Sequence, residues 1–242
     1  MTPLWLEEAV EECGFTAPLR FPRNLSTEIP SRLSVKVVAL PHLTPQAVRD
    51  WLLRRGIRQP VEGDASDFHG CMVAKAGHGF LFVDRSEENA EQRFTVAHEL
   101  SHFILDQWLP RQRALRVFGE QILPVLDGLR KPTPDEAMTA LFEKLSLGPP
   151  VDLMARDASG HYARRAVMDS EWRADLLGLE LLAPAKLVVP LVMDLPAEEA
   201  TGLLFFRYGL PREKADTYVQ ELHRRMRTPR FSIEQFLGVE GG

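Results

Sequence analysis

The sequence predicts an α+β fold in which a small antiparallel sheet packs on one long helix and further helices follow. Short runs rich in β-branched and aromatic residues occupy 35–40, 71–74 and 79–83, and the turn at 75–78 joins the last two runs as an antiparallel hairpin. Apolar residues then recur at helical spacing over 87–106. Most later segments carry helix-start and helix-stop residues, so the sheet is expected in the first part of the chain.

Two helices are predicted around the first strand. Thr2 and Pro3 are typical of an N-cap and a first helical residue, and Gly14 is a stop signal. Thr44–Pro45 opens a second helix that ends at Gly56. This second helix places three apolar residues on one face: Val48, Trp51 and Leu52. Both helices are expected to support the sheet.

Helix signals continue after the hairpin. The helix expected over 87–106 has one face made of Phe94, Ala97, Ser101, Ile104 and Leu105. Residues 107–165 are expected to form an insertion. Within it, the capping box at 133–136 predicts a helix to about Leu145, and a hairpin is expected to turn at 157–160.

Three more helices are predicted toward the C-terminus. Asp169 can cap a helix that runs from Ser170 to about Leu182, where Ala183 and Pro184 stop it. Residues 197–207 and 211–226 predict two further helices on either side of a turn.

Length and composition indicate a folded chain with one sizeable core and an accessory piece. The chain has 242 residues, which corresponds to about one and a half domains. We expect a domain at 1–195, which contains the insertion, and a helical region at 196–242 that is comparable to a helix-turn-helix. Hydrophobic residues at 45% and charged residues at 26% exclude a disordered chain, a collagen and a coiled coil.

Residue usage favours the cytoplasm as the location. Cys13 and Cys71 cannot form a disulfide framework or a four-thiolate metal site. The first twelve residues carry acids where an export signal would carry Lys or Arg. The most apolar stretch, 176–193, is interrupted by charges and prolines, so no membrane span is expected.

The strongest chemical signal is an HExxH motif in the predicted helix 87–106. His98 and His102 lie four residues apart, so both imidazoles face the same side of a helix and can chelate one metal ion. Glu99 can accept a proton from a water molecule at an open coordination position, which makes it the candidate catalytic base. The alternative is a helix with two ordinary histidines and a surface glutamate.

Catalytic zinc needs a third protein ligand. A longer HExxHxxGxxH motif is excluded, because Leu105 and Trp108 stand where it needs glycine and histidine. Downstream, Glu171 and Asp175 lie four residues apart, so one carboxylate can bind the metal while the other supports a ligating imidazole. The alternative is a solvated face that also includes Glu180. The rival ligands are Asp106, Asp135, Glu136, Asp157 and Asp169.

The remaining polar signals are weaker. By residue type alone, His78, His161 and Tyr162 can stabilise an oxyanion, although each is also an ordinary loop residue. Cys71 is either a redox-sensitive thiol or, as we favour, a small packing residue.

The C-terminal region is locally basic, although the whole chain has a net charge of −5. Over 207–230, seven basic and three acidic side chains give a local charge of +4. Helices on either side of the turn at 208–210 can contact DNA as a helix-turn-helix or recognise a protein partner. The alternative, which we favour, is a helical pair that packs on the core with a solvated basic face, with Phe205, Phe206 and Tyr218 in the core.

Two segments resemble the ImmA/IrrE family of metallo-endopeptidases: GFLFVDRSEENAEQRFTVAHELSHFILD (79–106) and EWRADLLGLELLAP (171–184). The stretch LPHLTPQAVRDWLLRRGI (40–57) is similar to the region ahead of this core in some members. The resemblance implies a zincin-like fold with zinc held by His98, His102 and Glu171 and with Glu99 catalytic. Mn²⁺ is an alternative metal for such a donor set.

The same resemblance implies a regulatory function. Family members typically cleave a helix-turn-helix repressor of the XRE type and so switch on genes of a mobile element, a toxin–antitoxin locus or a stress response. We therefore expect a zinc endopeptidase with a repressor or antitoxin as its protein substrate. One alternative is a non-catalytic zinc-containing regulator that binds DNA or a repressor through its basic C-terminal helices, and another is a protease with broad substrates.

Overall fold

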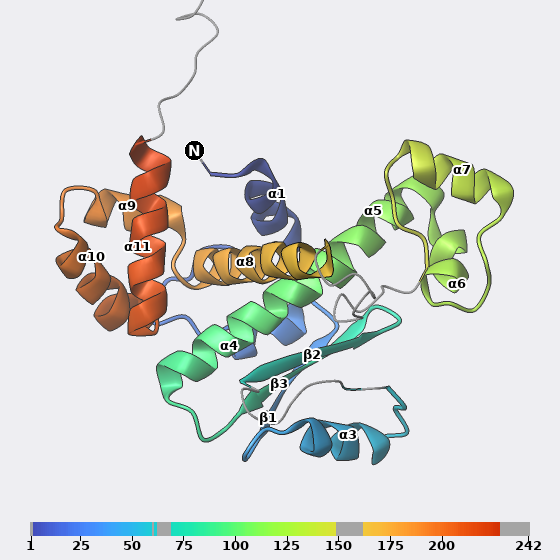
Figure 1. Ribbon diagram of the computed structural model, residues 1–242, viewed down its shortest axis with the longest axis horizontal. Helices are drawn as coiled ribbons and strands as arrows, with labels where there is room; N and C mark the ends of the chain where they lie inside the picture. Colours follow the sequence, from blue (N-terminus) through green and yellow to red (C-terminus); the bar gives the residue numbers. More distant parts are fainter. Residues whose placement is uncertain (1, 60, 62–68, 149–161, 228–242) are drawn as a thin grey trace, which may run out of the picture.

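A computed structural model describes residues 2–59, 61, 69–148 and 162–227, which form a small sheet covered by helices (Figure 1). Strands β1 (Val35–Leu40), β2 (Gly70–Lys75) and β3 (His78–Asp84) lie in the order β1-β3-β2. The predicted hairpin is confirmed, because β2 and β3 pair antiparallel. The expectation of an entirely antiparallel sheet is wrong, because β1 pairs with β3 in parallel. A β-rich run does not reveal its direction, which depends on how the chain returns to the sheet.

The two faces of the sheet pack against different helices. On one face, helix α3 (Pro45–Leu53) places Trp51 at 5.2 Å from both Phe80 and Phe82, measured between ring centroids. Helix α4 (Asn89–His102) crosses the opposite face, where Leu81 and Val83 join the main core (Figure 1). Alternate residues of β3 thus serve two separate clusters, as the two-residue period of a strand requires.

The predicted helix starts are partly confirmed. Thr44 caps α3, because its side chain accepts a hydrogen bond from the Ala47 amide, and the predicted face of Val48, Trp51 and Leu52 is buried. Helix α1 (Leu4–Cys13) starts after Pro3, which has no side-chain cap, so the prediction of Thr2 as the N-cap is wrong. A short helix α2 (Leu25–Glu28) is capped by Asn24.

Helix α4 extends beyond its predicted end near residue 106. It continues through a π-helical turn (Phe103–Trp108) into α5 (Leu109–Phe118). Pro110 is the second residue after this turn, at the start of α5. A proline cannot donate a backbone hydrogen bond, and its ring crowds the carbonyl four residues earlier, so the wider turn accommodates it inside a continuous helix.

The insertion folds around a small cluster of its own. Helices α6 (Leu123–Leu126) and α7 (Pro134–Phe142) follow α5. The cluster consists of Ala114, Ile122, Val125 and Leu126. The capping box is confirmed, since Thr133 and Glu136 exchange both hydrogen bonds, and α7 ends three residues before the predicted Leu145. The hairpin expected at 157–160 lies outside the described residues.

The C-terminal part is helical, as predicted. Helix α8 (Tyr162–Leu182) already includes Asp169, so the prediction that Asp169 caps this helix is wrong. It is followed by α9 (Ala185–Val192), α10 (Ala197–Leu203), a π-helical turn (Leu204–Tyr208) and α11 (Arg212–Arg227). One apolar core extends from α1 to α11. The division of the chain after residue 195 stays a prediction. Among the described helices, none is both long enough and apolar enough to cross a bilayer.

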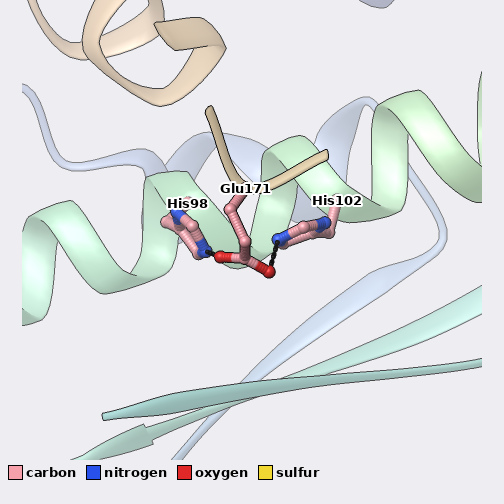
Figure 2. A group of neighbouring side chains, drawn as sticks. All are labelled: His98, His102 and Glu171. Carbon is pink, nitrogen blue, oxygen red and sulfur yellow. Dashed lines mark ion pairs between the residues drawn. The ribbon is translucent and has the colours of Figure 1, made fainter. Parts of the chain in front are cut away.

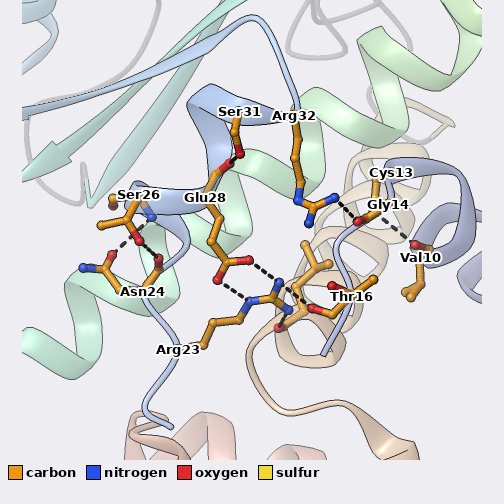
Figure 3. A network of polar contacts seen from close by, with 12 residues as sticks. Val10, Cys13, Gly14, Thr16, Arg23, Asn24, Ser26, Glu28, Ser31 and Arg32 are labelled. Atoms are coloured by element: carbon orange, nitrogen blue, oxygen red, sulfur yellow. Dashed lines mark hydrogen bonds and ion pairs between the residues drawn. The ribbon is translucent and has the colours of Figure 1, made fainter. Parts of the chain in front are cut away.

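A buried arginine connects the segment before α2 to the end of α8 (Figure 3). Arg23 forms a two-pronged ion pair with Glu28, at 2.6 and 2.9 Å. Its guanidinium also donates to the carbonyl of Thr16 at 2.9 Å and to that of Leu181 at 2.8 Å. Because Arg23 is almost fully buried, these acceptors replace its lost hydration and fix the position of α8 over the core.

Candidate metal centre

Helices α4 and α8 bring His98, His102 and Glu171 together (Figure 2). Nε2 of His98 lies 3.3 Å from Oε2 of Glu171, and Nε2 of His102 lies 3.4 Å from Oε1 of the same carboxylate. The two histidines lie one turn apart on α4, with ring centroids 4.8 Å from each other. Three donor groups from two helices therefore face one small space.

A glycine allows α8 to approach α4 closely. A Cβ atom at Gly178 would lie 3.2 Å from the backbone carbon of Ala97 and 3.3 Å from the amide nitrogen of His98. Ala97 itself is fully buried. Small residues at the crossing shorten the distance between the helix axes, so the side chain of Glu171, two turns earlier on α8, reaches both imidazoles.

The Nδ1 atom of each imidazole ring contacts a carboxylate. Nδ1 of His98 lies 2.8 Å from Oδ1 of Asp175, and Nδ1 of His102 lies 3.0 Å from Oδ2 of Asp106. When Nδ1–H donates to a carboxylate, the lone pair is on Nε2, which faces Glu171. Asp175 stands where the sequence predicts a supporting group. Asp106, a rival ligand by sequence, supports His102 instead, and its position four residues after His102 is the sequence signal for this role.

The three donor groups are close enough to share one ion. Their ligand atoms all lie within 4.8 Å of one another. Each imidazole nitrogen lies 3.3 or 3.4 Å from a different oxygen of the Glu171 carboxylate, and bonds of about 2.1 Å place the ligand atoms of a tetrahedral ion about 3.4 Å apart. The histidine side chains are mostly buried, whereas the side chain of Glu171 is 52% exposed. The donor set can thus hold a divalent cation and leave one side open to solvent.

The protonation of these groups reflects the same contacts. Burial alone disfavours the charged form of His98, but hydrogen bonds to Asp175 and Glu171 outweigh burial and raise its pKa to about 9. The pKa of His102 rises to about 10 for the same reason, with Asp106 as the first partner. Hydrogen bonds from His102 and His98 hold the pKa of Glu171 far below its usual value. In the metal-free site, His98 and His102 are therefore positively charged, and they pair with the carboxylates of Glu171, Asp175 and Asp106.

Glu99 lies on the side of α4 that faces strand β2. Its side chain is buried, and a Cβ atom at Gly70 would lie only 2.5 Å from its Oε1 atom. Burial raises the pKa of the Glu99 carboxyl, while the nearby His98 and His102 lower it in part. A buried carboxylate next to the donor set is suited to accept and return a proton.

The rival carboxylates lie elsewhere or have other partners. Asp169 and Asp135 are exposed, Asp157 lies outside the described residues, and Glu136 pairs with Arg130 at 2.6 Å. The side chain of Glu180 is only 11% exposed and accepts hydrogen bonds from the amide of Ala185 and the hydroxyl of Tyr218. The alternative of a solvated face over Glu171, Asp175 and Glu180 is therefore wrong for Glu180. Across the part of the chain that the structure describes, His98, His102 and Glu171 form the one group of three or more such side chains close enough to share an ion.

The structure gives no support to a catalytic role for the residues that were weak candidates by sequence. His78 lies at the start of β3 and is exposed, His161 lies outside the described residues, and the side chain of Tyr162 is not described. Cys71 is half-buried on β2 and packs against the cluster under α3, as the packing interpretation predicts.

The C-terminal helices pack on the core, as in the favoured alternative. Tyr218 is buried and Phe205 is half-buried, but Phe206 is 78% exposed, so the prediction of Phe206 as a core residue is wrong. Several basic side chains of α11 are engaged in ion pairs. Arg224 and Arg225 both contact Glu221 at 2.8 Å, and Lys214 contacts Asp175.

Comparison with known proteins gives a family match for one part of the chain. Residues 55–120 match the model of the IrrE N-terminal-like domain of peptidase family M78, which confirms the resemblance to the ImmA/IrrE family over this segment. The match includes β2, β3, α4 and α5 and ends well before Glu171. No curated protein matches the chain. No solved structure matches it either.

Proposed function

We propose that this chain, which contains an IrrE N-terminal-like domain of the M78 metallopeptidase family, is a zinc-dependent endopeptidase with a zincin-like core. The observation that carries the proposal is the arrangement of His98, His102 and Glu171 around one space, with the buried carboxylate of Glu99 beside it. Two imidazoles and a carboxylate suit Zn²⁺, and Mn²⁺ is the alternative ion.

The chemistry divides between the ion and the protein. A bound divalent cation supplies Lewis acidity, which polarises a peptide carbonyl and acidifies water. Glu99 accepts a proton from the attacking water and transfers it to the amine nitrogen as the C–N bond breaks. The products are a carboxylic acid and an amine, so the hydrolysis balances with one water molecule. Asp175 and Asp106 keep both imidazoles aimed at the ion throughout.

We propose a helix-turn-helix repressor of the XRE type, or an antitoxin, as the substrate, and the control of gene expression as the result. The family resemblance supports this assignment. Strand β2 lies at the edge of the sheet, next to Glu99, so it can pair with an extended segment of another protein. An extended peptide on β2 would run past the side of α4 that carries Glu99.

The first test compares wild type with Glu171→Ala and with Asp169→Ala. Asp169 is an exposed acid on the same helix and serves as a matched control. Elemental analysis and cleavage of a repressor encoded beside the gene are measured on the same samples, with an unrelated unfolded protein as a second substrate. We expect about one zinc per chain in wild type and in Asp169→Ala, and loss of zinc and cleavage in Glu171→Ala.

The other outcomes are equally informative. Zinc retained by Glu171→Ala would show that the third ligand is wrong. Zinc without any cleavage would favour the non-catalytic regulator, for which a gel-shift assay at several salt concentrations tests DNA binding. Cleavage of both substrates would identify a broad protease instead of a dedicated one.

A further inference from the structure

A lysine of α11 contacts the carboxylate that supports His98. Nζ of Lys214 lies 2.6 Å from Oδ2 of Asp175, while Oδ1 of Asp175 lies 2.8 Å from Nδ1 of His98. The two carboxylate oxygens therefore have separate partners. The contacts link α11 to α8 and α8 to α4, so the last described helix reaches the metal centre through one intermediate side chain.

Lys214 is held from a second direction by an aromatic ring. Its Nζ atom lies 4.6 Å from the ring centroid of Phe94, which is within the range of a cation–π contact. Phe94 precedes His98 by one turn of α4, and the two ring centroids are 6.1 Å apart. The side chains of Lys214 and Asp175 are both about one-third exposed, so water screens the ion pair only in part.

The two supporting carboxylates differ in how their positions are fixed. Asp106 belongs to the same continuous helix as His102 and lies one turn away, so the helical backbone sets its distance from the imidazole. Asp175 belongs to α8 and approaches His98 from a different helix. Its carboxylate has a second contact besides the imidazole, with Lys214 at Oδ2.

We propose that Lys214 is a positioning residue for the metal centre. Its ammonium group fixes the Asp175 carboxylate, which accepts the Nδ1–H hydrogen bond of His98 and keeps Nε2 of His98 directed at the ion. This inference rests on the proposed metal site and assigns a new role to the C-terminal helices. Through Lys214, α11 completes the surroundings of the metal centre, so metal binding depends on the docking of α11 against α8.

The test measures Co²⁺ binding, because Co²⁺ replaces Zn²⁺ in similar sites and its visible absorption reports coordination geometry. The variants are Lys214→Met, which keeps an unbranched side chain one atom shorter and removes the ammonium group, and Lys214→Arg, which keeps the charge. Lys186→Met, at an exposed lysine of α9, is the matched control. Loss of a supporting group typically weakens metal affinity by 10- to 100-fold. Since Lys214 acts through Asp175, we expect Lys214→Met to raise the Co²⁺ dissociation constant by about three- to tenfold.

Two comparisons separate positioning from a general effect of charge. Lys214→Arg should bind Co²⁺ with near wild-type affinity and spectrum, and Lys186→Met should be unchanged. In an Asp175→Asn background, Lys214→Met should cause no further loss, because the carboxylate through which it acts is absent. Binding by Lys214→Met that equals or exceeds that of wild type, or additive losses in the double variant, would overturn the inference. If Lys214→Met loses its helical circular dichroism, Lys214→Gln takes its place.

A metal-free readout keeps this inference distinguishable from the proposed function. In the apo protein, the ¹⁵N chemical shift of His98 Nδ1 reports its hydrogen bond to Asp175, and we expect it to change in Lys214→Met and not in Lys186→Met. An unchanged shift, with unchanged Co²⁺ binding, rejects the role of Lys214 while the peptidase proposal stands. If wild-type protein binds no metal, or binds metal equally well without Glu171, the proposed function is rejected. The ¹⁵N chemical shift alone then decides whether Lys214 positions His98.

Discussion

Nδ1 of His102 lies 3.0 Å from Oδ2 of Asp106, one turn later on the same continuous helix. This contact uses one ring nitrogen and leaves Nε2 directed at Glu171. We expect Asp106→Asn to weaken zinc affinity by about tenfold, because an amide accepts the hydrogen bond without the negative charge. Competition with a chromophoric chelator measures the affinity. Asp135→Asn, at an exposed acid of α7, should have no effect. An unchanged affinity in Asp106→Asn would mean that this contact does not support the ion.

Substitution of Glu99 should reduce catalysis without reducing metal binding. Its carboxylate is buried beside the donor set but is not one of the three groups that could hold an ion. We expect Glu99→Gln to keep about one zinc per chain and to lose cleavage by about 10²- to 10⁴-fold, the usual contribution of a general base. Metal content and initial cleavage rates on the same preparation check this. Full activity in Glu99→Gln would contradict the role of Glu99 as the general base.

Because Gly70 has no side chain, the carboxylate of Glu99 can lie against it. A Cβ atom at this position would lie 2.5 Å from Oε1 of Glu99 and 2.6 Å from Cγ2 of Thr95. The carboxylate of Glu99 is the end of a flexible side chain, whereas the methyl group of Thr95 is fixed close to its own backbone, so Gly70→Ala should displace Glu99. A displacement of about 1 Å can cost about 100-fold in rate, and we expect a loss of this order with zinc retained.

The control for Gly70→Ala is Gly202→Ala. Gly202 lies in α10, and a Cβ atom there would have no heavy atom within 4 Å. Cleavage rate, zinc content and thermal unfolding are compared for both variants. Equal activity in the two variants would show that the approach of Gly70 to Glu99 does not set the position of the base.

Features within one turn or one hairpin were accessible from the sequence. The spacing of His98 and His102 fixes their common face, and the capping box at Thr133 fixes the start of α7. These predictions depend only on the geometry of a single helix.

Features that depend on how helices cross could not be predicted from the sequence. Gly178 allows the close approach of α8 to α4, and a lone glycine in a helix does not indicate which helix it faces. The contact between Lys214 and Asp175 joins residues 39 positions apart, and Lys214 stood among basic residues assigned to a solvated face. The parallel pairing of β1 with β3 depends in the same way on the path of the chain.

Metal binding should release protons, because the metal-free site holds them. The pKa values of His98 and His102 are raised to about 9 and about 10, so at pH 7 both rings are charged. Coordination requires neutral imidazole, and protons therefore compete with the ion. The pKa of Glu171 is lowered, so this carboxylate is already ionised at pH 7 and releases no proton. Apparent affinity should fall as the pH falls below about 10, and below about 9 by up to about 100-fold per pH unit.

The number of protons released distinguishes this site from an ordinary pair of histidines. Calorimetric titration of the metal-free protein with zinc at pH 7, in two buffers of different ionisation enthalpy, gives that number from the difference in heat. We expect about two protons per zinc from the imidazoles and up to about half a proton more from water that the ion acidifies. Two histidines with the ordinary pKa of about 6.5 would together release only about half a proton at pH 7, or about one with that water. A value of about one or less would show that Asp175 and Asp106 do not hold the imidazoles in their charged form, and the carboxylate support of both ligands would be rejected with it.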